Sequence, residues 1–384
     1  MKMPLDDIRV LDMTHVWMGP WCTMMLAEMG AEVIRVEPPW GAIDRLSEGM
    51  TFGGASFTFH HFNLNKKDIT LNLKHPEGKR LFKELLKKSD VLIQNMSPGS
   101  MEKLGLGYDE LKKINPKIIY AALSGFGQYG PYTRRNSYAP IAEAMSGHTR
   151  LTGDGVDPNG PPIEMAMAYG DLGPGTLAAM AIIAALRYRD HTGVGQMIDV
   201  AQFDCMTAFN PAVTGYNLSG MLLHELRKKS RGGSNVGGMF KTKDGGYVVM
   251  GAWSPSAVEN LKKLLGSDEP TKEMATQYIG EHNRDEIAKI LIDADIAAAP
   301  IYQINETVAD PHLKARDMWV TVEHPTAGKI TVPNFPVKMS ETPGKITSAA
   351  PLLSQNTREI LIGLLGVKEE ELNKLMEEQA IGDA

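Results

Sequence analysis

The sequence predicts an α/β protein in which a doubly wound parallel sheet, with helices on both faces, is joined to a smaller domain. Short β-type runs alternate with segments of helical spacing along roughly the first half of the chain. This alternation is typical of parallel sheets whose strands are connected by helical crossovers. The pattern changes near Met221, where a basic and then a glycine-rich segment precede a hairpin signal. We therefore expect a large domain over residues 1–221, a small α+β domain over 222–325 and a C-terminal segment over 326–384.

The expected strands of the large domain are short runs rich in apolar and β-branched residues. They cover residues 8–13, 31–37, 68–73, 90–95, 117–124 and 196–200. The helix pattern is clearest over 76–88, where Leu81, Leu85 and Leu86 share one face and lysines occupy the other. Further helices are expected from Pro20, over 109–114, over 172–186 and from Ala201.

The small domain begins with an alternating segment, residues 239–251, centred on Lys243-Asp244-Gly245-Gly246. Alternation around such a turn indicates a β-hairpin. Two amphipathic helices follow, over 258–265 and 284–293, and the proline-rich segment 333–351 is expected to be an extended linker. The last helices, 356–365 and 369–379, end the chain.

Composition excludes several classes of protein. The 384 residues carry 40 Lys+Arg against 46 Asp+Glu, a net charge of −6, and no basic block, so a nucleic-acid partner is not expected. The two cysteines, Cys22 and Cys205, exclude a disulfide scaffold and a cysteine-rich zinc site. No histidine pairs with a carboxylate at ligand spacing, so we expect no metal.

The chain is expected to be cytoplasmic, without a membrane partner. Asp6 and Asp7 stand where a secretory signal would carry its apolar stretch. The longest apolar run, 172–186, contains Pro174 and is shorter than the ~17 residues that span a bilayer. We interpret this run as a buried helix.

Asp171 is the carboxylate that the sequence singles out. It precedes the apolar helix, and Gly170, Gly173 and Gly175 around it allow another molecule to approach the backbone closely. The residue could be a helix N-cap. It could also be a nucleophile, since carboxylates act in covalent catalysis and free amides at a helix start stabilise negative charge.

Three weaker signals have simpler explanations. Residues 125–130 match G-x-G-x-x-G after a strand, but Pro131 follows and no helix opens, which disfavours a dinucleotide site. Cys22 lies near a helix start without a partner base, so an inert core thiol is the better interpretation. His15 follows the first strand, where such sheets bind ligands, and a structural role and a ligand role both stay open.

Several segments in fixed order resemble one family, the class III CoA-transferases, which include formyl-CoA:oxalate and carnitine CoA-transferases. The resemblance extends along nearly the whole chain, and the ordered set is more specific than any one segment. The segments are 11–16 with Gly19-Pro20, 30–37, 65–67 with 71–74, 123–127, 142–147, 170–171, 192–196 and Asp310-Pro311.

The resemblance implies a Rossmann-like large domain built from both chain ends, a small domain between them, and two subunits interlocked as a homodimer. It implies that Asp171 is the nucleophile that moves CoA from an acyl-CoA donor to a carboxylic acid acceptor. The covalent intermediates are an aspartyl anhydride and an aspartyl-CoA thioester. No tightly bound cofactor is implied, because the coenzyme A thioester is itself the substrate.

The resemblance also assigns substrate contacts. It implies that a first set of residues binds CoA: Leu71, Asn72, Leu73, Lys74, Asn95, Met96, Ser97, Lys103, Arg135, Asn136, Ser137, Tyr138 and Ala139. A second set is implied to form the acyl pocket and a mobile glycine-rich loop: His15, Trp17, Met18, Gly232, Gly233, Gly237 and Gly238.

The chain departs from the family pattern at four positions. Trp17 stands where the formyl-CoA enzyme has Gln, Ala139 replaces a Glu, and Lys103 replaces an Arg. Pro38 replaces an Arg that contacts the nucleotide, for which Arg35 or Arg45 could substitute. A polar oxalate pocket is therefore not expected, and Trp17, Met18, Trp21 and Trp40 favour a bulky apolar acyl group, unless these residues are packing.

Two alternatives remain at this point. An α-methylacyl-CoA racemase-like isomerase would pair the Asp with a His in an upstream His-Asp dipeptide, but residues 135–140 contain no His, and His148 is a poor substitute. A non-catalytic acyl-CoA binding protein would not need Asp171.

Overall fold

The computed structural model describes residues 2–46, 49–230 and 236–383. The chain forms two compact units: unit 1 comprises residues 1–213 and 317–384, and unit 2 comprises residues 214–316. Unit 1 is therefore built from both ends of the chain.

Unit 1 contains a six-stranded parallel sheet in the order β5-β2-β1-β6-β7-β8. Its strands are β1 (Arg9–Met13), β2 (Glu32–Glu37), β5 (Lys67–Thr70), β6 (Val91–Gln94), β7 (Ile119–Ser124) and β8 (Met197–Ala201). The chain builds outward from β1 to β5, then returns to the other side of β1 and builds outward to β8. The direction of winding thus reverses between β1 and β6.

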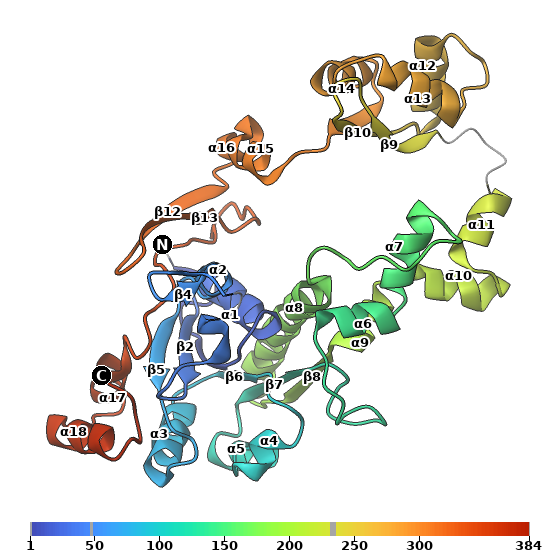
Figure 1. Cartoon of the computed structure of the whole chain (residues 1–384). Helices are drawn as coiled ribbons and strands as arrows, with labels where there is room; N and C mark the ends of the chain where they lie inside the picture. The colour runs from blue at the N-terminus through green and yellow to red at the C-terminus, as the bar shows by residue number, and fades with distance from the viewer. Residues whose placement is uncertain (1, 47–48, 231–235, 384) are drawn as a thin grey trace. The chain divides into compact units, whose positions relative to one another are not determined.

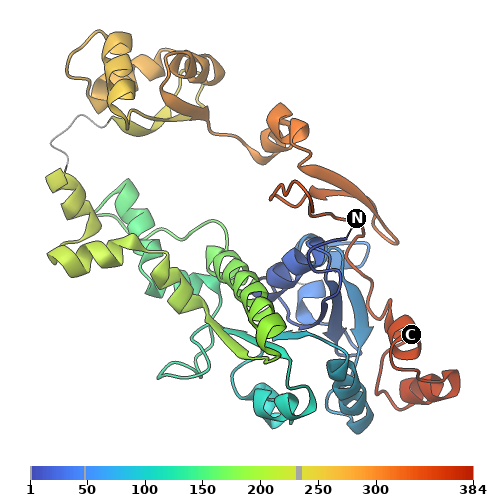
Figure 2. The same cartoon turned by 180° about the vertical axis from the view of Figure 1, so that it is seen from behind.

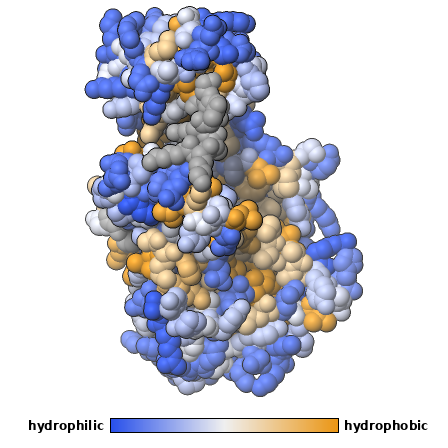
Figure 3. Space-filling model, turned by 90° about the vertical axis from the view of Figure 1, so that its right-hand side faces the viewer, coloured by the Kyte–Doolittle hydropathy of each residue, from blue (hydrophilic) through white to orange (hydrophobic). Residues whose placement is uncertain are grey.

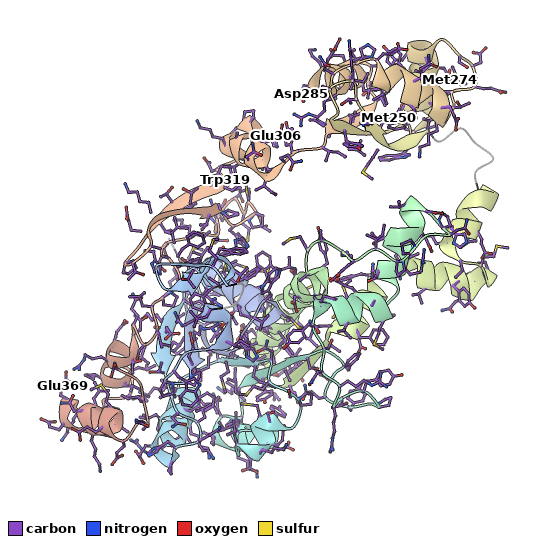
Figure 4. The ribbon with its side chains drawn as sticks, viewed as in Figure 1. Met250, Met274, Asp285, Glu306, Trp319 and Glu369 are labelled. Carbon is purple, nitrogen blue, oxygen red and sulfur yellow. The ribbon has the colours of Figure 1, made fainter. Side chains whose placement is uncertain are left out.

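Helices cover both faces of this sheet, which confirms the expected mixed α/β architecture (Figures 1 and 2). On one face an apolar cluster that includes Leu81, Phe82 and Ile360 packs several helices against the sheet. These include α3 (Pro76–Lys87), α5 (Tyr108–Ile114), α17 (Thr357–Gly363) and α18 (Glu369–Glu377, Figure 4). On the other face Cys22 and Ile182 belong to the cluster formed with α1 (Met18–Glu28) and α8 (Tyr169–Thr192).

Helix α8 begins before and ends after the expected 172–186 segment. By length and composition it could cross a membrane, and half of its most apolar window is buried within the structure. Ala178, Ile182 and Leu186 are buried in the cluster shared with α1. The helix thus packs as a core element of unit 1, with Asp171 in its first turn.

Other elements of unit 1 are short. They are η1 (Ile43–Arg45), β3 (Thr51–Phe52), β4 (Ala55–Ser56), α2 (Phe57–Phe62), α4 (Ser100–Lys103), α6 (Ala139–Met145), α7 (His148–Val156), α9 (Gln202–Ala208) and the hairpin of β12 (Trp319–His324) with β13 (Gly328–Pro333). Several, including α6 and α7, were not expected, because short helices with Gly or Pro carry little periodic signal.

Unit 2 contains an antiparallel sheet in the order β11-β10-β9. Met250 of β10 (Figure 4) lies in its buried core with Val248, Leu261 and Leu291. The strands are β9 (Gly237–Lys241), β10 (Tyr247–Gly251) and β11 (Ala297–Pro300); the helices are α10 (Pro211–Ser219, which crosses the unit boundary), α11 (Leu223–Ser230), α12 (Pro255–Leu265), α13 (Lys272–Gly280), α14 (Arg284–Asp293), α15 (Ile304–Ala309) and α16 (Pro311–Ala315).

The observed unit boundaries differ from those expected at 221/222 and 325/326. A boundary after residue 325 falls inside the β12–β13 hairpin, which begins at Trp319 (Figure 4). Val322 and Val332 of this hairpin pack with Met24 and Leu64 of unit 1. Burial of that apolar face groups the hairpin with the parallel sheet rather than with the antiparallel one.

Candidate active site

A pocket of about 470 Å³ opens in unit 1 where the winding direction of the sheet reverses. It is lined by segments that follow the carboxyl ends of β1, β6 and β7, where ligands bind in open α/β sheets. The lining residues are His15, Val16, Trp17, Met18, Asn95, Met96, Ser97, Pro98, Ser100, Leu123, Ser124, Gly125, Arg135, Asn136, Ser137, Tyr138, Asp171 and Gln202. Most of the residues assigned from the family resemblance thus share one pocket.

Asp171 lies in this pocket and is only 8% exposed. It is the third residue of α8, whose N-cap is Ala168, so its side chain does not occupy the N-cap position considered from the sequence. Burial raises the pKa of the Asp171 carboxyl to about 7; a hydrogen bond from Gln202 lowers it, and the nearby Glu143 raises it further. A buried carboxylate that titrates near neutrality in a pocket is a candidate reactive group.

Gln202 fixes one oxygen of Asp171. Its Nε2 donates to Oδ1 of Asp171 at 2.6 Å, and its Oε1 accepts from the Ser137 hydroxyl at 3.1 Å. The strand β8 ends at Ala201, so Gln202 begins α9 at the same sheet edge. Gln202 was not among the residues predicted from the sequence, because nothing in its local sequence marks it and strand pairing alone brings it to Asp171.

A second buried carboxylate, Glu143, lies on α6. It is 1% exposed, and its Oε1 accepts a hydrogen bond from the Gly170 backbone N–H at 2.8 Å. A Cβ on Gly170 would lie 2.7 Å from the Ala139 carbonyl oxygen, so α6 and α8 approach too closely for any other residue at 170. Glu143 therefore ties the start of α8 to α6, a role that the sequence analysis did not assign.

The loop after β1 is held by side chains on neighbouring elements. Asn95 accepts from the His15 backbone N–H at 3.1 Å and donates to the His15 carbonyl at 2.8 Å. Val16 has a φ of 69°, a strained conformation for a β-branched residue, and its N–H donates to Asp44. Burial lowers the pKa of the His15 imidazole, which favours its neutral form. Asn95 thus positions the loop that carries Trp17.

A network of buried ion pairs contacts the backbone of this loop. The fully buried Arg35 donates to Glu37 at 2.7 Å, to Asp44 at 2.8 Å and to the Thr14 carbonyl at 3.1 Å. Arg45 pairs with Glu37 at 2.8 Å. Our hypothesis that Arg35 or Arg45 replaces the missing nucleotide-contacting Arg is therefore wrong, because both guanidinium groups are buried and paired.

Some residues assigned to CoA do not line the pocket. The strand expected over 68–73 ends at Thr70, and Leu71 is 1% exposed in the core. Asn72 bonds to the carbonyls of Gln379 and Ala380, while Leu73 is half-buried and Lys74 is exposed beside it. The segment 71–74 thus follows the outer strand β5, since tertiary strand order separates it from β6.

The remaining assigned residues are dispersed. Lys103 is exposed at the end of α4, and Ala139 is buried at the start of α6. Gly237 and Gly238 pair with Gly251 and Met250 as part of β9, so this end of the expected glycine-rich loop is a strand. Gly232 and Gly233 lie outside the described residues.

His148 and Cys22, which were considered as reactive groups from the sequence, do not take part in the pocket. The imidazole Nε2 of His148 lies 2.9 Å from the Met206 carbonyl, and His148 is not among the pocket residues. Cys22 is fully buried, and burial strongly raises the pKa of its thiol. Within residues 2–46, 49–230 and 236–383, no three His, Cys, Asp or Glu side chains cluster as metal ligands.

The glycine motif 125–130 forms a loop after β7 rather than a helix start. Gly127 has a φ of 83° and donates its N–H to the Ser124 hydroxyl at 2.9 Å. A Cβ on Gly125 would lie 2.1 Å from Cβ of Ser137. The glycine at 125 is required because the segment that carries Ser137 crosses it.

A doubly wound sheet with a pocket at its switch point and a buried carboxylate inside is the framework of an α/β enzyme. The family model of CoA-transferase family III matches residues 5–357, and the chain belongs to this family. It is an enzyme of this class, which confirms the resemblance inferred from the sequence.

Relatives of known activity match along nearly the full chain. The succinyl-CoA–D-citramalate CoA-transferase of Chloroflexus aurantiacus is 33% identical, with 98% of each chain covered. The formyl-CoA:oxalate CoA-transferase of Streptomyces coelicolor is 34% identical, with 97% of each covered. The crystal structure of a CAIB/BAIF family protein from Brucella suis superposes with a TM-score of 0.82 at 28% identity, covering 95% of this chain and 100% of that one. The racemase-like alternative is not favoured.

Proposed function

We propose that this enzyme moves CoA from an acyl-CoA donor to a carboxylic acid through covalent intermediates on Asp171. The observation that carries the proposal is a carboxylate, 8% exposed, whose pKa is raised to about 7 by burial within the switch-point pocket. Such a group is desolvated, which makes it a stronger nucleophile than a carboxylate in water.

In the proposed cycle, a carboxylate oxygen of Asp171 attacks the thioester carbonyl of the donor and expels CoA thiolate, which leaves a mixed anhydride. The thiolate then attacks Cγ of Asp171 and releases the donor acid, leaving an aspartyl-CoA thioester. The acceptor carboxylate attacks Cγ, frees the thiolate again and forms a second anhydride. Attack of the thiolate on the acceptor carbonyl yields the new acyl-CoA and restores Asp171. Each step exchanges one acyl bond for another, so no ATP is consumed.

We propose that the thioester end of CoA lies in the pocket. Arg135, Ser137 and Tyr138 line one wall, and Asn95 to Ser97 line another. The exposed cations Lys103 and Arg135 are available to phosphate oxygens, which favour cationic donors. No tightly bound cofactor is needed, since CoA enters and leaves as substrate.

Trp17 is proposed to bound an apolar acyl site. It lines the pocket, is half-buried, and its ring centroid lies 5.2 Å from that of Phe62. Trp21 also contacts Phe62, but its indole N–H donates to Thr176 at 2.9 Å, whereas Trp40 is 69% exposed. Of the three tryptophans singled out from the sequence, Trp17 is thus the one that lines the pocket.

We predict that the enzyme uses an apolar or aryl acid at least about tenfold better than oxalate, because an indole has a single N–H donor and lacks the acceptor and second donor of a carboxamide. Trp17→Gln should narrow this gap, and Trp40→Gln serves as the control. The measurement is kcat/KM for a panel of acids that includes succinate and citramalate, read by mass spectrometry of the CoA products. A preference for oxalate or another dicarboxylate by the unmodified enzyme would show that Trp17 only packs.

We further propose that the enzyme is an obligate homodimer. Apolar side chains remain exposed on the adjoining helices α6 and α8, including Ile141 (45%), Met145 (40%) and Met180 (61%). Apolar patches are also visible among the hydrophilic surface in Figure 3. Exposed apolar patches commonly mark interfaces between subunits.

The dimer prediction is tested by sedimentation velocity over a wide range of protein concentration. We expect one species of twice the chain mass, because an interlocked dimer cannot separate unless its chains unfold. Met180→Glu should reduce the yield of folded dimer, since it places a charge in the proposed interface, whereas Arg187→Glu on the exposed polar part of α8 is the control. A folded, active monomer at low concentration would contradict the proposal.

A further inference from the structure

The two carboxylate oxygens of Asp171 have different surroundings. Oδ1 accepts a hydrogen bond of 2.6 Å from Nε2 of Gln202. The orientation of this amide follows from chemistry, because a carboxylate can only accept and therefore requires the NH2 group on its side. Oε1 of Gln202 then faces the Ser137 hydroxyl, which donates to it at 3.1 Å. Gln202 is 5% exposed and lines the pocket, so this donor is preorganised.

The proposed cycle gives these two oxygens different fates. When CoA thiolate attacks Cγ of the first anhydride, the carbonyl electron pair moves onto the oxygen that is not in the anhydride bridge. Collapse of this tetrahedral species re-forms that carbonyl and breaks the bond from Cγ to the bridging oxygen, which leaves with the donor acid. The later attack by the acceptor carboxylate places charge on the same retained oxygen and expels thiolate. One oxygen thus becomes an oxyanion twice in each cycle.

We propose that Gln202 is a catalytic residue whose amide holds Oδ1 as the retained oxygen, stabilises the oxyanion that forms on it, and leaves Oδ2 as the nucleophile. The inference rests on the proposed role of Asp171. Donors aimed at a developing oxyanion in a pocket shielded from water are among the largest contributions to catalysis. Ser137 is a positioning residue, because it acts on Asp171 only through the amide of Gln202.

The same hydrogen bond has a second measurable consequence. A donor to the ionised carboxylate favours that form, so Gln202 lowers the pKa of Asp171 while burial raises it. In the wild-type enzyme the ionised fraction, and with it kcat/KM for the donor, should rise with pH and level off above about 7. Removing the donor should move this acidic limb to higher pH.

The test uses Gln202→Met, which keeps the length of the side chain, and Gln202→Glu, which keeps its shape. We expect kcat for transfer to fall about 10²–10³-fold with KM for the acyl-CoA donor changed less than about threefold. The acidic limb of kcat/KM should shift upward in both variants, further in Gln202→Glu because a second carboxylate opposes ionisation of the first. Intact-protein mass spectrometry after mixing with acyl-CoA alone should show slower formation of the CoA-linked enzyme.

Ser137→Ala is the matched variant, because it retains the amide but removes the bond that orients it. We expect Ser137→Ala to lose less kcat than Gln202→Met does, and to show a smaller shift of the acidic limb. Two outcomes for Gln202→Met would overturn the role of Gln202. One is a wild-type kcat with an unmoved acidic limb. The other is an equal loss of kcat at every pH, which indicates a structural effect alone.

The Asp171→Asn variant separates this inference from the proposed function. If Asp171→Asn stays active, the proposed function fails. If Asp171→Asn is inactive and Gln202→Met is normal, only the role of Gln202 fails.

Discussion

Replacing Asp171 with alanine or asparagine is expected to abolish CoA transfer while the protein remains folded. Alanine has no nucleophile, and the asparagine amide can donate a hydrogen bond but cannot form the anhydride. Loss of a covalent nucleophile removes the pathway itself, so the rate should fall by about 10³-fold or more. Folding should persist, because burial of this carboxylate raises its pKa and therefore opposes its ionised form in the folded protein.

The measurements are transfer rates with saturating donor and acceptor, circular dichroism, and mass spectrometry for the CoA-linked enzyme. Asp199→Asn is a suitable control: Asp199 on β8 accepts from the Gln128 N–H at 2.9 Å, which an asparagine oxygen can also do, and it does not line the pocket. Retention of more than about a tenth of the wild-type rate in either Asp171 variant would exclude Asp171 as the nucleophile.

The second large effect concerns stability. Arg35→Met should lower the free energy of unfolding by about 3–5 kcal/mol, because it leaves the buried carboxylates of Glu37 and Asp44 without their shared cation. The Thr14 carbonyl would also lose its donor. Since Asp44 holds the backbone of Val16, the pocket loop should loosen as well, with a higher KM for acyl-CoA.

Urea denaturation followed by tryptophan fluorescence measures this loss in unit 1, where Trp17 and Trp21 report on the affected loop. The matched control is Arg80→Met. Arg80 pairs with Glu77 and Glu371 at 2.7 Å, but its side chain is 43% exposed, so we expect a change of at most about 1 kcal/mol. Similar losses in both variants would show that burial does not set the strength of the Arg35 network.

Arg35 and Lys103 are both cations, yet residue type alone did not predict which of them is accessible to a substrate. Both are basic residues, and both were considered as contacts for the coenzyme A substrate. In the structure Arg35 is fully buried among carboxylates, whereas Lys103 is exposed on α4. The difference depends on Glu37 and Asp44, whose carboxylates both accept hydrogen bonds from Arg35.

In the pocket, too, one residue could be predicted from local sequence and another could not. Asp171 stood out in the sequence because glycines flank it before an apolar helix, a local pattern. Gln202 carries no such pattern and lies 31 positions further along the chain. Its importance appears only when β7 and β8 are paired in parallel, which brings residues after both strands to one edge.

By itself the sequence determined the α/β class, most strands of the parallel sheet, the nucleophile candidate and the family. These depend on local apolar periodicity and on the order of residues, both of which are properties of the sequence itself. Only the tertiary structure decided which strand ends share a pocket, that segment 71–74 follows an outer strand, that Asn95 holds a loop, and that Arg35 and Arg45 are not free. Those outcomes depend on strand order and on burial, because a side chain's partners and ionisation are set by neighbours distant in sequence.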